Sequence, residues 1–520
     1  MNVLLVQPSY PVTYWGFQHA LSLVGKKVSL PPLGLLTVAA LLPRDWSYRL
    51  IDLNAASLRD DDLAWSDVVL TGGMRVQSAG MEDVVARSHA SGRPVIIGGP
   101  AVSADPSLVP EADVVFAGEA EGRAGELISV IEKLVATWSG GMHGEKKSRP
   151  RFVPSPSTHP EMKDSPIPRF DLLEQSQYIS MAIQYSRGCP FSCEFCDVVS
   201  IFGRRPRVKS CDQLIAELDA LQRTGYRGTL FLVDDNFIGN RSSVRELLPR
   251  LARWQRRHGN PFEFYTEASV DLSLDDLLMD EMVEAGFGAV FLGIETPSVA
   301  ALEKAGKRQN LSLDLSEAVE RITARGLEVM GGFIVGFDHD SPEVFELQRR
   351  FIESLPIPLA MVGLLIALPG TELWRRLERE GRLREPTSGD QFGRPNFEPA
   401  MDETELLSGY AALMKDLYSP RSYFRRCKAY LERTTPSSPD RPVRPGGIMM
   451  LLRAIYRLGL LGSRRRYFWE LLMMSLRRGK ASISWATAKA IQGEHLIRYT
   501  EQDVLPRIEL ALEEIRGEPY

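Results

Sequence analysis

The sequence predicts an α/β protein in which two series of strand–helix units precede a helical carboxy-terminal region. Three observations predict this fold class. Short apolar runs ending in Gly, Pro, Asn or Asp recur over residues 1–136, six similar runs recur over residues 171–399, and helical patterns dominate residues 400–520. At 520 residues the chain is too long for one hydrophobic core, so several domains are expected.

The amino-terminal series predicts an open, doubly wound parallel sheet. Its strands are expected at NVLLVQP, YRLIDLN, DVVLTGG, PVIIGGP and DVVFAGEAEG, and such uninterrupted apolar runs are typical of strands buried on both faces. Ligands of these sheets bind at the carboxyl ends of the strands, where glycines let the backbone approach a large flat ligand. Tight turns would explain the same glycines equally well. The candidate ligand contacts are Pro8, Ser9, Thr71, Gly72, Gly98, Gly99, Gly118 and Glu119.

The second series follows a stretch rich in Pro, Ser and charged residues. Residues 137–170 predict an interdomain linker with little regular structure. The strands of the second series are then expected at MAIQYSRG, TLFLVDDNF, FEFYTEAS, AVFLGIETP, LEVMGGFIVGF and AMVGLLIAL.

The most specific motif is SRGCPFSCEFC, which places Cys189, Cys193 and Cys196 in a C-x-x-x-C-x-x-C spacing. Three soft thiolates can hold three irons of a 4Fe–4S cluster and leave the fourth iron open to a small molecule. Zinc is the inorganic alternative, but it usually takes four protein ligands. The other two cysteines, Cys211 and Cys427, lie outside the motif, and we interpret both as structural.

This motif, with the aromatic Phe195 before its last cysteine, resembles that of the radical S-adenosylmethionine (SAM) superfamily. The resemblance implies a partial (β/α)6 barrel and an open iron that chelates SAM. Electron transfer to SAM then yields methionine and a 5′-deoxyadenosyl radical that abstracts hydrogen from substrate. Active sites of barrels form at the carboxyl ends of the strands.

The strand ends of the second series supply the candidate SAM contacts. Glu267 and Glu295 each end an apolar strand, where a charge is costly without a ligand or partner. VDDNF stands where many radical SAM proteins carry a GGE-like motif for the SAM amine, and it departs from that pattern. We expect Asp235 and Asn236 to contact SAM, with a helix N-cap role as the alternative for either residue.

The domain order resembles that of the cobalamin-dependent radical SAM family, in the branch that contains the hopanoid methylase. Members join a flavodoxin-like, cobalamin-binding-type domain to the barrel and a helical extension. The resemblance implies a 4Fe–4S cluster, SAM and cobalamin, an electron donor of flavodoxin or ferredoxin type, and methylation of an unactivated carbon of a small molecule or lipid. The chain lacks the D-x-H-x-x-G motif of some cobalamin domains, and we interpret His19 in GFQHAL as a helix residue.

Two other functions fit the same motifs. A radical SAM enzyme could catalyse cyclisation, rearrangement or oxidation, with the amino-terminal domain as a substrate module. A non-enzymatic iron–sulfur protein is the second alternative, although an electron carrier normally supplies four cluster ligands.

Composition limits the partners and the location. A net charge of −5 gives no sign of nucleic-acid binding, and no basic leader or long apolar run stands in the sequence, so a cytoplasmic protein is expected. Residues 440–480 carry ten Lys or Arg against two acids, interleaved with IMMLL, LGLLG and YFWELLMMSL. This pattern fits either a basic amphipathic region on the inner face of the membrane or a helical cap packed on the barrel.

Overall fold

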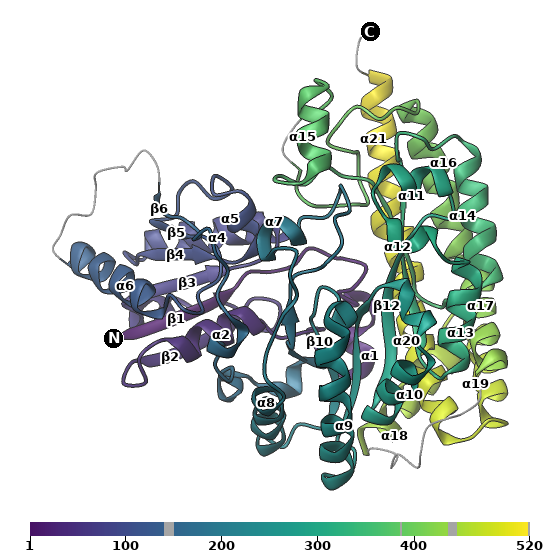
Figure 1. Ribbon diagram of the computed structural model, residues 1–520, viewed down its shortest axis with the longest axis horizontal. Coiled ribbons are helices and arrows are strands. Elements are labelled where there is room, and N and C mark those ends of the chain that lie inside the picture. Colours follow the sequence, from purple (N-terminus) through teal and green to yellow (C-terminus); the bar gives the residue numbers. More distant parts are fainter. Residues whose placement is uncertain (140–149, 385–386, 435–444, 518–520) are drawn as a thin grey trace.

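The computed structural model describes residues 1–139, 150–384, 387–434 and 445–517. An amino-terminal parallel sheet lies on one side of the molecule and the carboxy-terminal helices on the other, with a second parallel sheet between them (Figure 1). Parts of the expected linker and of the basic stretch, residues 140–149 and 435–444, lie outside the described residues.

The first sheet has the strand order β2-β1-β3-β4-β5-β6, and all its pairs are parallel. The order 2-1-3-4-5 is that of flavodoxin-like folds, which confirms the predicted doubly wound architecture. The strands are β1 (Asn2–Gln7), β2 (Ser47–Asp52), β3 (Val68–Gly72), β4 (Val95–Gly98), β5 (Val114–Phe116) and β6 (Arg151–Val153).

Strand β6 corrects the expectation that residues 137–170 hold little regular structure. It pairs with β5 in the register Val114↔Arg151 to Phe116↔Val153 and adds a sixth strand to the expected five. A strand of three residues between Pro-rich segments is too short to show an alternating pattern, so the sequence does not predict it.

Helices cover both faces of the first sheet. Leu35 on α2 and Ile131 on α6 pack on one face, while Met81 on α4 and Val102 on α5 pack on the other. The helices of this part of the chain are α1 (Gln18–Val24), α2 (Leu33–Leu41), α3 (Asp60–Trp65), α4 (Ser78–Ala90), α5 (Pro100–Ala104) and α6 (Ala124–Ser139).

The second sheet is a curled half-barrel of six parallel strands in the order β7-β10-β11-β12-β13-β14. This confirms the partial (β/α)6 barrel. Its strands are β7 (Ser180–Ile183), β10 (Gly228–Leu232), β11 (Phe262–Ala268), β12 (Phe287–Glu295), β13 (Glu328–Val335) and β14 (Ala360–Leu364). Its helices are α8 (Cys211–Arg223), α9 (Arg241–Arg257), α10 (Asp276–Ala285), α11 (Val299–Lys304), α12 (Arg308–Leu311), α13 (Leu315–Ala324), α14 (Glu343–Ser354) and α15 (Glu372–Arg379).

A short antiparallel hairpin encloses the cysteine motif. Strands β8 (Ser186–Arg187) and β9 (Arg207–Val208) pair across it, and α7 (Val198–Phe202) lies inside the enclosed loop. The three cysteines therefore follow directly after the first barrel strand and its turn.

The carboxy-terminal region is helical, as predicted. Its helices are α16 (Glu403–Leu417), α17 (Pro420–Arg433), α18 (Pro445–Ala454), α19 (Arg465–Leu476), α20 (Lys480–Tyr499) and α21 (Leu505–Gly517). A π-helical turn, Ile455–Leu460, follows α18. Within the described ranges, no helix combines the length and the apolar character that crossing a bilayer requires.

The segment after β1 reaches across the molecule to these helices. The Tyr14 and Tyr418 hydroxyls form a hydrogen bond of 2.5 Å, and His19 Nε2 lies 2.8 Å from Asp503 Oδ2. His19 belongs to α1, which packs against α20, so its interpretation as a helix residue is confirmed.

Candidate functional site

The three motif cysteines lie in the loop between β8 and α7, and each is partly buried and free of disulfides. Burial raises the pKa of the thiols of Cys189, Cys193 and Cys196. Among the described residues, no three or more His, Cys, Asp or Glu side chains are arranged to hold a single metal ion. A 4Fe–4S cluster fits these donors better than zinc does, because it offers each thiolate its own iron.

Two carboxylates that follow β10, the buried Asp234 and the partly buried Asp235, hold this loop through its backbone. Asp234 accepts hydrogen bonds from Tyr185 N at 2.8 Å and from the Ser186 N and Oγ atoms at 2.8 and 2.7 Å. Asp235 accepts one from Gly188 N at 2.7 Å. Burial raises the pKa of Asp234 to about 7 and that of Asp235 to about 6.

These contacts revise the expectations for VDDNF. The loop backbone occupies one oxygen of Asp235, so this residue positions the cysteine loop, and its contact with SAM stays a prediction. The helix cap at α9 is Asn240, whose Oδ1 accepts from Ser243 N at 3.3 Å, and not Asp235 or Asn236.

Within this motif, the side chain of Asn236 can still accept a hydrogen bond. Its side chain is 3% exposed, and its Nδ2 donates to Ser269 Oγ at 3.2 Å. Its Oδ1 has no hydrogen-bond partner in the described part of the chain. A buried acceptor without a partner is costly, so Asn236 fits a ligand that presents an N–H group.

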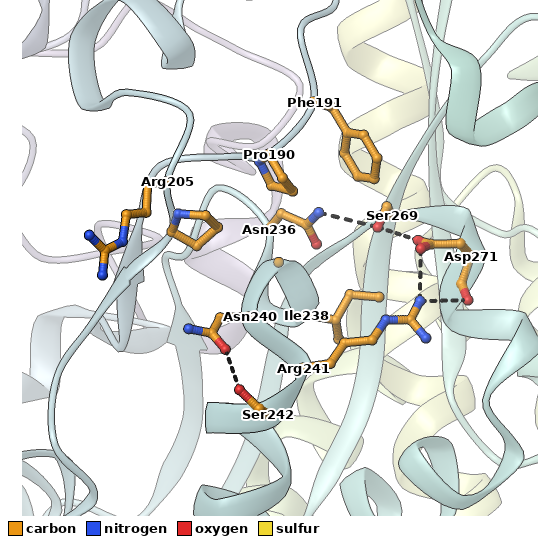
Figure 2. Close-up of a pocket in the computed structure, with 12 residues that line it drawn as sticks. Pro190, Phe191, Arg205, Asn236, Ile238, Asn240, Arg241, Ser242, Ser269 and Asp271 are labelled. Atoms are coloured by element: carbon orange, nitrogen blue, oxygen red, sulfur yellow. Dashed lines mark hydrogen bonds and ion pairs between the residues drawn. The ribbon is translucent and has the colours of Figure 1, made fainter.

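A pocket of about 410 Å³ opens beside the cysteine loop, with Asn236 and Ser269 on one wall (Figure 2). Pro190 and Phe191, which lie between the first two cysteines, line the same pocket. The pocket therefore connects the end of β10 with the loop that carries the thiols.

On the other side of the loop stands a largely buried lysine that the sequence pattern did not indicate. Lys307 Nζ lies 2.6 Å from Glu295 Oε1 and 6.0 Å from the Phe195 ring centroid. Burial lowers the pKa of Lys307, but Glu295 and Cys193 outweigh this effect and raise the pKa above its usual value. Gln309 Nε2 lies 3.9 Å from Cys193 Sγ, so a cation and an amide donor both approach the thiols.

Glu295 itself sits in unusual backbone geometry. Its φ is +65°, and the register between β12 and β13 shifts between Gly293 and Glu295. A left-handed non-glycine residue at a bulge is a strained arrangement of the kind that occurs beside active sites. The bulge aims the Glu295 carboxylate at Lys307.

Glu267, the second strand-end glutamate, lies partly buried at the end of β11. Within the described residues its carboxyl group has no hydrogen bond or ion pair, and burial, with Asp235 and Asp234 adding to it, raises its pKa to about 8. A cationic ligand would compensate this carboxylate.

The inner face of the half-barrel is apolar and rich in aromatic rings. Phe231 and Tyr265 stack with ring centroids 4.7 Å apart, and Trp15 meets Phe291 edge-on at 5.6 Å. The Trp15 Nε1 donates to Met361 Sδ at 3.1 Å. All five side chains are only partly buried, so together they line a surface and do not fill a closed core.

At the carboxyl ends of the strands of the first sheet, the glycines bring neighbouring strand ends close together. A Cβ on Gly72 would lie 2.4 Å from the Gly98 carbonyl oxygen, and Gly99 has a φ of +92°. Gly118, with a φ of +82°, donates its N–H to Ser103. Close packing of the chain against itself therefore explains Gly72 and Gly118, and contact of these glycines with a cofactor stays a prediction.

Two of the predicted cofactor contacts at these strand ends, Thr71 and Pro8, form hydrogen bonds within the protein, whereas Ser9 faces solvent. Thr71 Oγ1 donates to Val6 O at 2.8 Å, and the Pro8 carbonyl accepts from Gln77 Nε2 at 2.8 Å, whereas Ser9 is exposed.

Glu119 joins the first sheet to the hairpin around the cysteines. Its oxygens lie 2.7 Å from Arg187 Nη1, 2.8 Å from Arg207 Nη2 and 3.2 Å from His159 Nδ1. Arg187 also pairs with Glu121 at 2.8 Å. Glu119 thus positions the strands that flank the cysteine loop, and its expected contact with a cofactor stays a prediction.

The parallel half-barrel, with three cysteines in the loop after its first strand, defines a radical SAM protein. A model of the radical SAM superfamily matches residues 183–351, and a domain of unknown function, DUF4070, matches residues 371–506.

Full-length relatives give the family. An uncharacterized methyltransferase of Synechocystis sp. is 38% identical over 508 residues, covering 96% of this chain and 92% of the relative. The hopanoid C-2 methylase of Rhodopseudomonas palustris strain TIE-1 is 36% identical over 510 residues, covering 96% and 94%. The chain belongs to the same radical SAM family as these two proteins.

Two solved structures share the whole architecture. The cobalamin-dependent radical SAM enzyme OxsB, with aqua-cobalamin and SAM bound, has a TM-score of 0.58 at 14% identity and covers 100% of this chain and 82% of its own. The methyltransferase TsrM of Kitasatospora setae, with cobalamin and a [4Fe-4S] cluster bound, has a TM-score of 0.55 at 14% identity and covers 90% and 97%. At this identity the likeness concerns the fold.

Proposed function

We propose that the protein is a cobalamin-dependent radical SAM methylase that acts on an unactivated carbon of a hopanoid-like polycyclic lipid. The observation that carries this proposal is the match to the hopanoid C-2 methylase over nearly the full length of both chains. The arrangement of thiols, carboxyl groups and aromatic rings at the barrel agrees with it.

Different residues of the site would hold the cluster and SAM. When bound, the cluster and SAM supply the hydrogen-abstracting chemistry, and cobalamin supplies the methyl group that is transferred. Cys189, Cys193 and Cys196 hold the cluster. The Asn236 Oδ1 and the Glu267 carboxylate are acceptors for the SAM ammonium group, since both lack a partner in the described residues.

Lys307 and the strand ends of the first sheet complete the cofactor sites. Lys307 places a buried positive charge beside Cys193 and offers a donor to the SAM carboxylate. The glycine edge at Gly72, Gly98 and Gly99 gives cobalamin a backbone surface, and exposed Ser9 stands at the end of β1.

The substrate would lie against the aromatic inner face of the half-barrel. Trp15, Phe231, Tyr265 and Phe291 offer flat apolar surfaces, and Glu267 borders them in register with Phe291. Such a surface suits fused saturated rings, which bury large apolar area without needing hydrogen bonds.

We also propose that the carboxy-terminal region contacts a membrane surface from which the lipid is taken. Helices α18 and α19 and the turn between them lie together at the lower end of the molecule in Figure 1, and Trp469 Nε1 donates to Gly459 O at 2.9 Å. Exposed large apolar side chains gather there as an apolar patch, made of Ile448, Met449, Leu452, Tyr456, Leu460, Leu461, Trp469, Met473 and Leu476.

The charges around the apolar patch favour anionic lipid. Arg453, Arg457, Arg465 and Arg477 are exposed, and none forms an ion pair with a carboxylate of the described residues. A basic, apolar helical surface of this kind binds in the interface of a bilayer.

The methylase proposal is tested with reconstituted enzyme, a hopanoid, and SAM carrying a deuterated methyl group. The expected product is a hopanoid heavier by one labelled methyl, detected by mass spectrometry. Cys193→Ala should abolish SAM cleavage, whereas Cys211→Ala, at a buried cysteine outside the loop, should retain it. SAM cleavage with a cyclised or oxidised product and no labelled methyl would support the other radical SAM functions instead.

A further inference from the structure

The cluster loop reaches the protein surface at its tip. Ser192, next to Cys193, is exposed, and Pro190 and Phe191 line the pocket of about 410 Å³ shown in Figure 2. An electron that enters at this tip has only the loop itself to cross before it reaches the thiol-bound irons.

Exposed basic side chains surround this tip. Arg204 and Arg205 lie in the turn before β9, and the Arg204 Nη2 approaches the Pro190 carbonyl at 3.5 Å. On the other side, Glu194 N donates to Ala305 O at 3.0 Å, which places the exposed Arg308 of α12 near the loop. None of these three guanidinium groups has an ion pair among the residues that the structure describes.

Nearby acids do not cancel this charge. Glu194 pairs with Arg376 at 3.2 Å, and Asp271, which lines the pocket, pairs with Arg241 at 2.7 Å. The negative charge of exposed Glu303 is offset by the positive charge of its exposed neighbour Lys304. Arg204, Arg205 and Arg308 thus place three unpaired positive charges around the loop tip, against the partly buried Asp197, which forms no ion pair among the described residues, although the chain as a whole carries −5.

From this surface we infer that an acidic one-electron carrier protein docks on the face formed by the loop tip, the pocket and Arg204, Arg205 and Arg308. The inference rests on the proposed function, which requires reduction of the cluster. One electron passes from the reduced carrier to the cluster; the carrier is oxidised by one electron and no proton need move. A flavodoxin and a ferredoxin share the required chemistry, a negative surface around the redox centre.

Unpaired charges on a binding rim act mainly on the association rate. Complementary potentials raise association rates by about 10- to 1,000-fold at low ionic strength, and salt screens this gain. The concave pocket beside the loop offers the carrier a fitted contact next to the basic rim.

The test measures how fast the cluster of the reconstituted full-length enzyme is reduced, by stopped-flow absorbance. Reduced flavodoxin, reduced ferredoxin and titanium(III) citrate serve as separate electron sources. For Arg204→Glu/Arg205→Glu we expect reduction by an acidic carrier to slow by about tenfold or more at low salt, with the gap closing at high salt. Reduction by titanium(III) citrate should be unchanged.

The matched control is Arg253→Glu/Arg257→Glu, which makes the same charge change near the far end of α9. These two exposed arginines stand about 18 and 24 Å along the helix from its first residue, at 1.5 Å per residue. Arg205→Glu alone is the control for a disturbance of the loop and should show part of the effect. Among the described residues the Arg205 side chain forms no hydrogen bond, whereas Arg204 Nη2 approaches the Pro190 carbonyl.

Equal carrier-driven rates in the loop variants and the wild type would overturn the inference, as would equal slowing in the α9 control. A response to one carrier and not to the other identifies the source of the electron. Because cluster reduction is followed without SAM or substrate, a failure to methylate leaves this test intact, and a failure of docking leaves titanium-driven methylation intact.

Discussion

Removing the charge of Glu119 should loosen the hairpin that holds the cluster. Glu119 is buried and pairs with Arg187 and Arg207, whose side chains are 13% and 7% exposed. In Glu119→Gln, Arg187 keeps Glu121, but Arg207 loses its carboxylate and keeps only the Pro160 and Phe202 carbonyls. One uncompensated buried charge costs about 3 kcal/mol, the lower part of the range for broken buried pairs.

The assay is urea unfolding of the apoprotein, followed by iron analysis after reconstitution. Glu126→Gln is the control, because Glu126 forms an exposed pair with Arg123 that is worth about 0–1 kcal/mol. We expect a large loss of unfolding free energy and of retained iron in Glu119→Gln and almost none in Glu126→Gln. Equal losses in the two variants would refute the idea that Glu119 couples the first sheet to the cluster loop.

Three further outcomes are expected. Because burial raises the pKa of Glu267 from 4.5 to about 8, the folded state binds more protons than the unfolded chain between these values, and stability falls as pH rises. At about 1.4 kcal/mol per pKa unit, Glu267→Gln should therefore stabilise the apoprotein by about 4 kcal/mol at pH 8 and by almost nothing near pH 4.5, as measured by urea unfolding; parallel pH profiles would contradict this. Lys307→Met should weaken SAM binding in equilibrium dialysis by about tenfold, or 1.4 kcal/mol, while Lys304→Met, at an exposed position, should not. Leu461→Glu should reduce sedimentation with phosphatidylglycerol vesicles, whereas Leu510→Glu, equally exposed on α21, should sediment like the wild type.

Local sequence patterns predicted the architecture and the thiols because those features are local. Cys189, Cys193 and Cys196 lie within eight residues, and the apolar runs of the long strands can be recognised in the sequence. The division into domains at residues 136, 171 and 400 stays a prediction. The three-residue strand β6 carried too little pattern to be recognised.

The rest of the site depends on contacts between distant segments. Lys307 lies between the two short helices α11 and α12, and it comes near the thiols only because this segment folds back against the cysteine loop. Trp15 precedes the barrel by more than 150 residues yet lines its inner face. Glu119 looked like a ligand contact because the arginines that occupy it come from another domain.

The contacts of the amino-terminal segment with the carboxy-terminal helices bear on how the chain matures during synthesis. Tyr14 and Tyr418 are 404 residues apart, and His19 and Asp503 are 484 apart. Tyr14 and His19 cannot complete these contacts until the carboxy-terminal helices have left the ribosome, whereas Trp15 needs only β12 and β14 for its contacts with Phe291 and Met361. Pairings this remote are slow to find and leave apolar surface exposed meanwhile. A chain released before α16 would thus keep its thiol loop but lack the helices that anchor the segment around Tyr14 and His19, and we expect it to be recovered as aggregate.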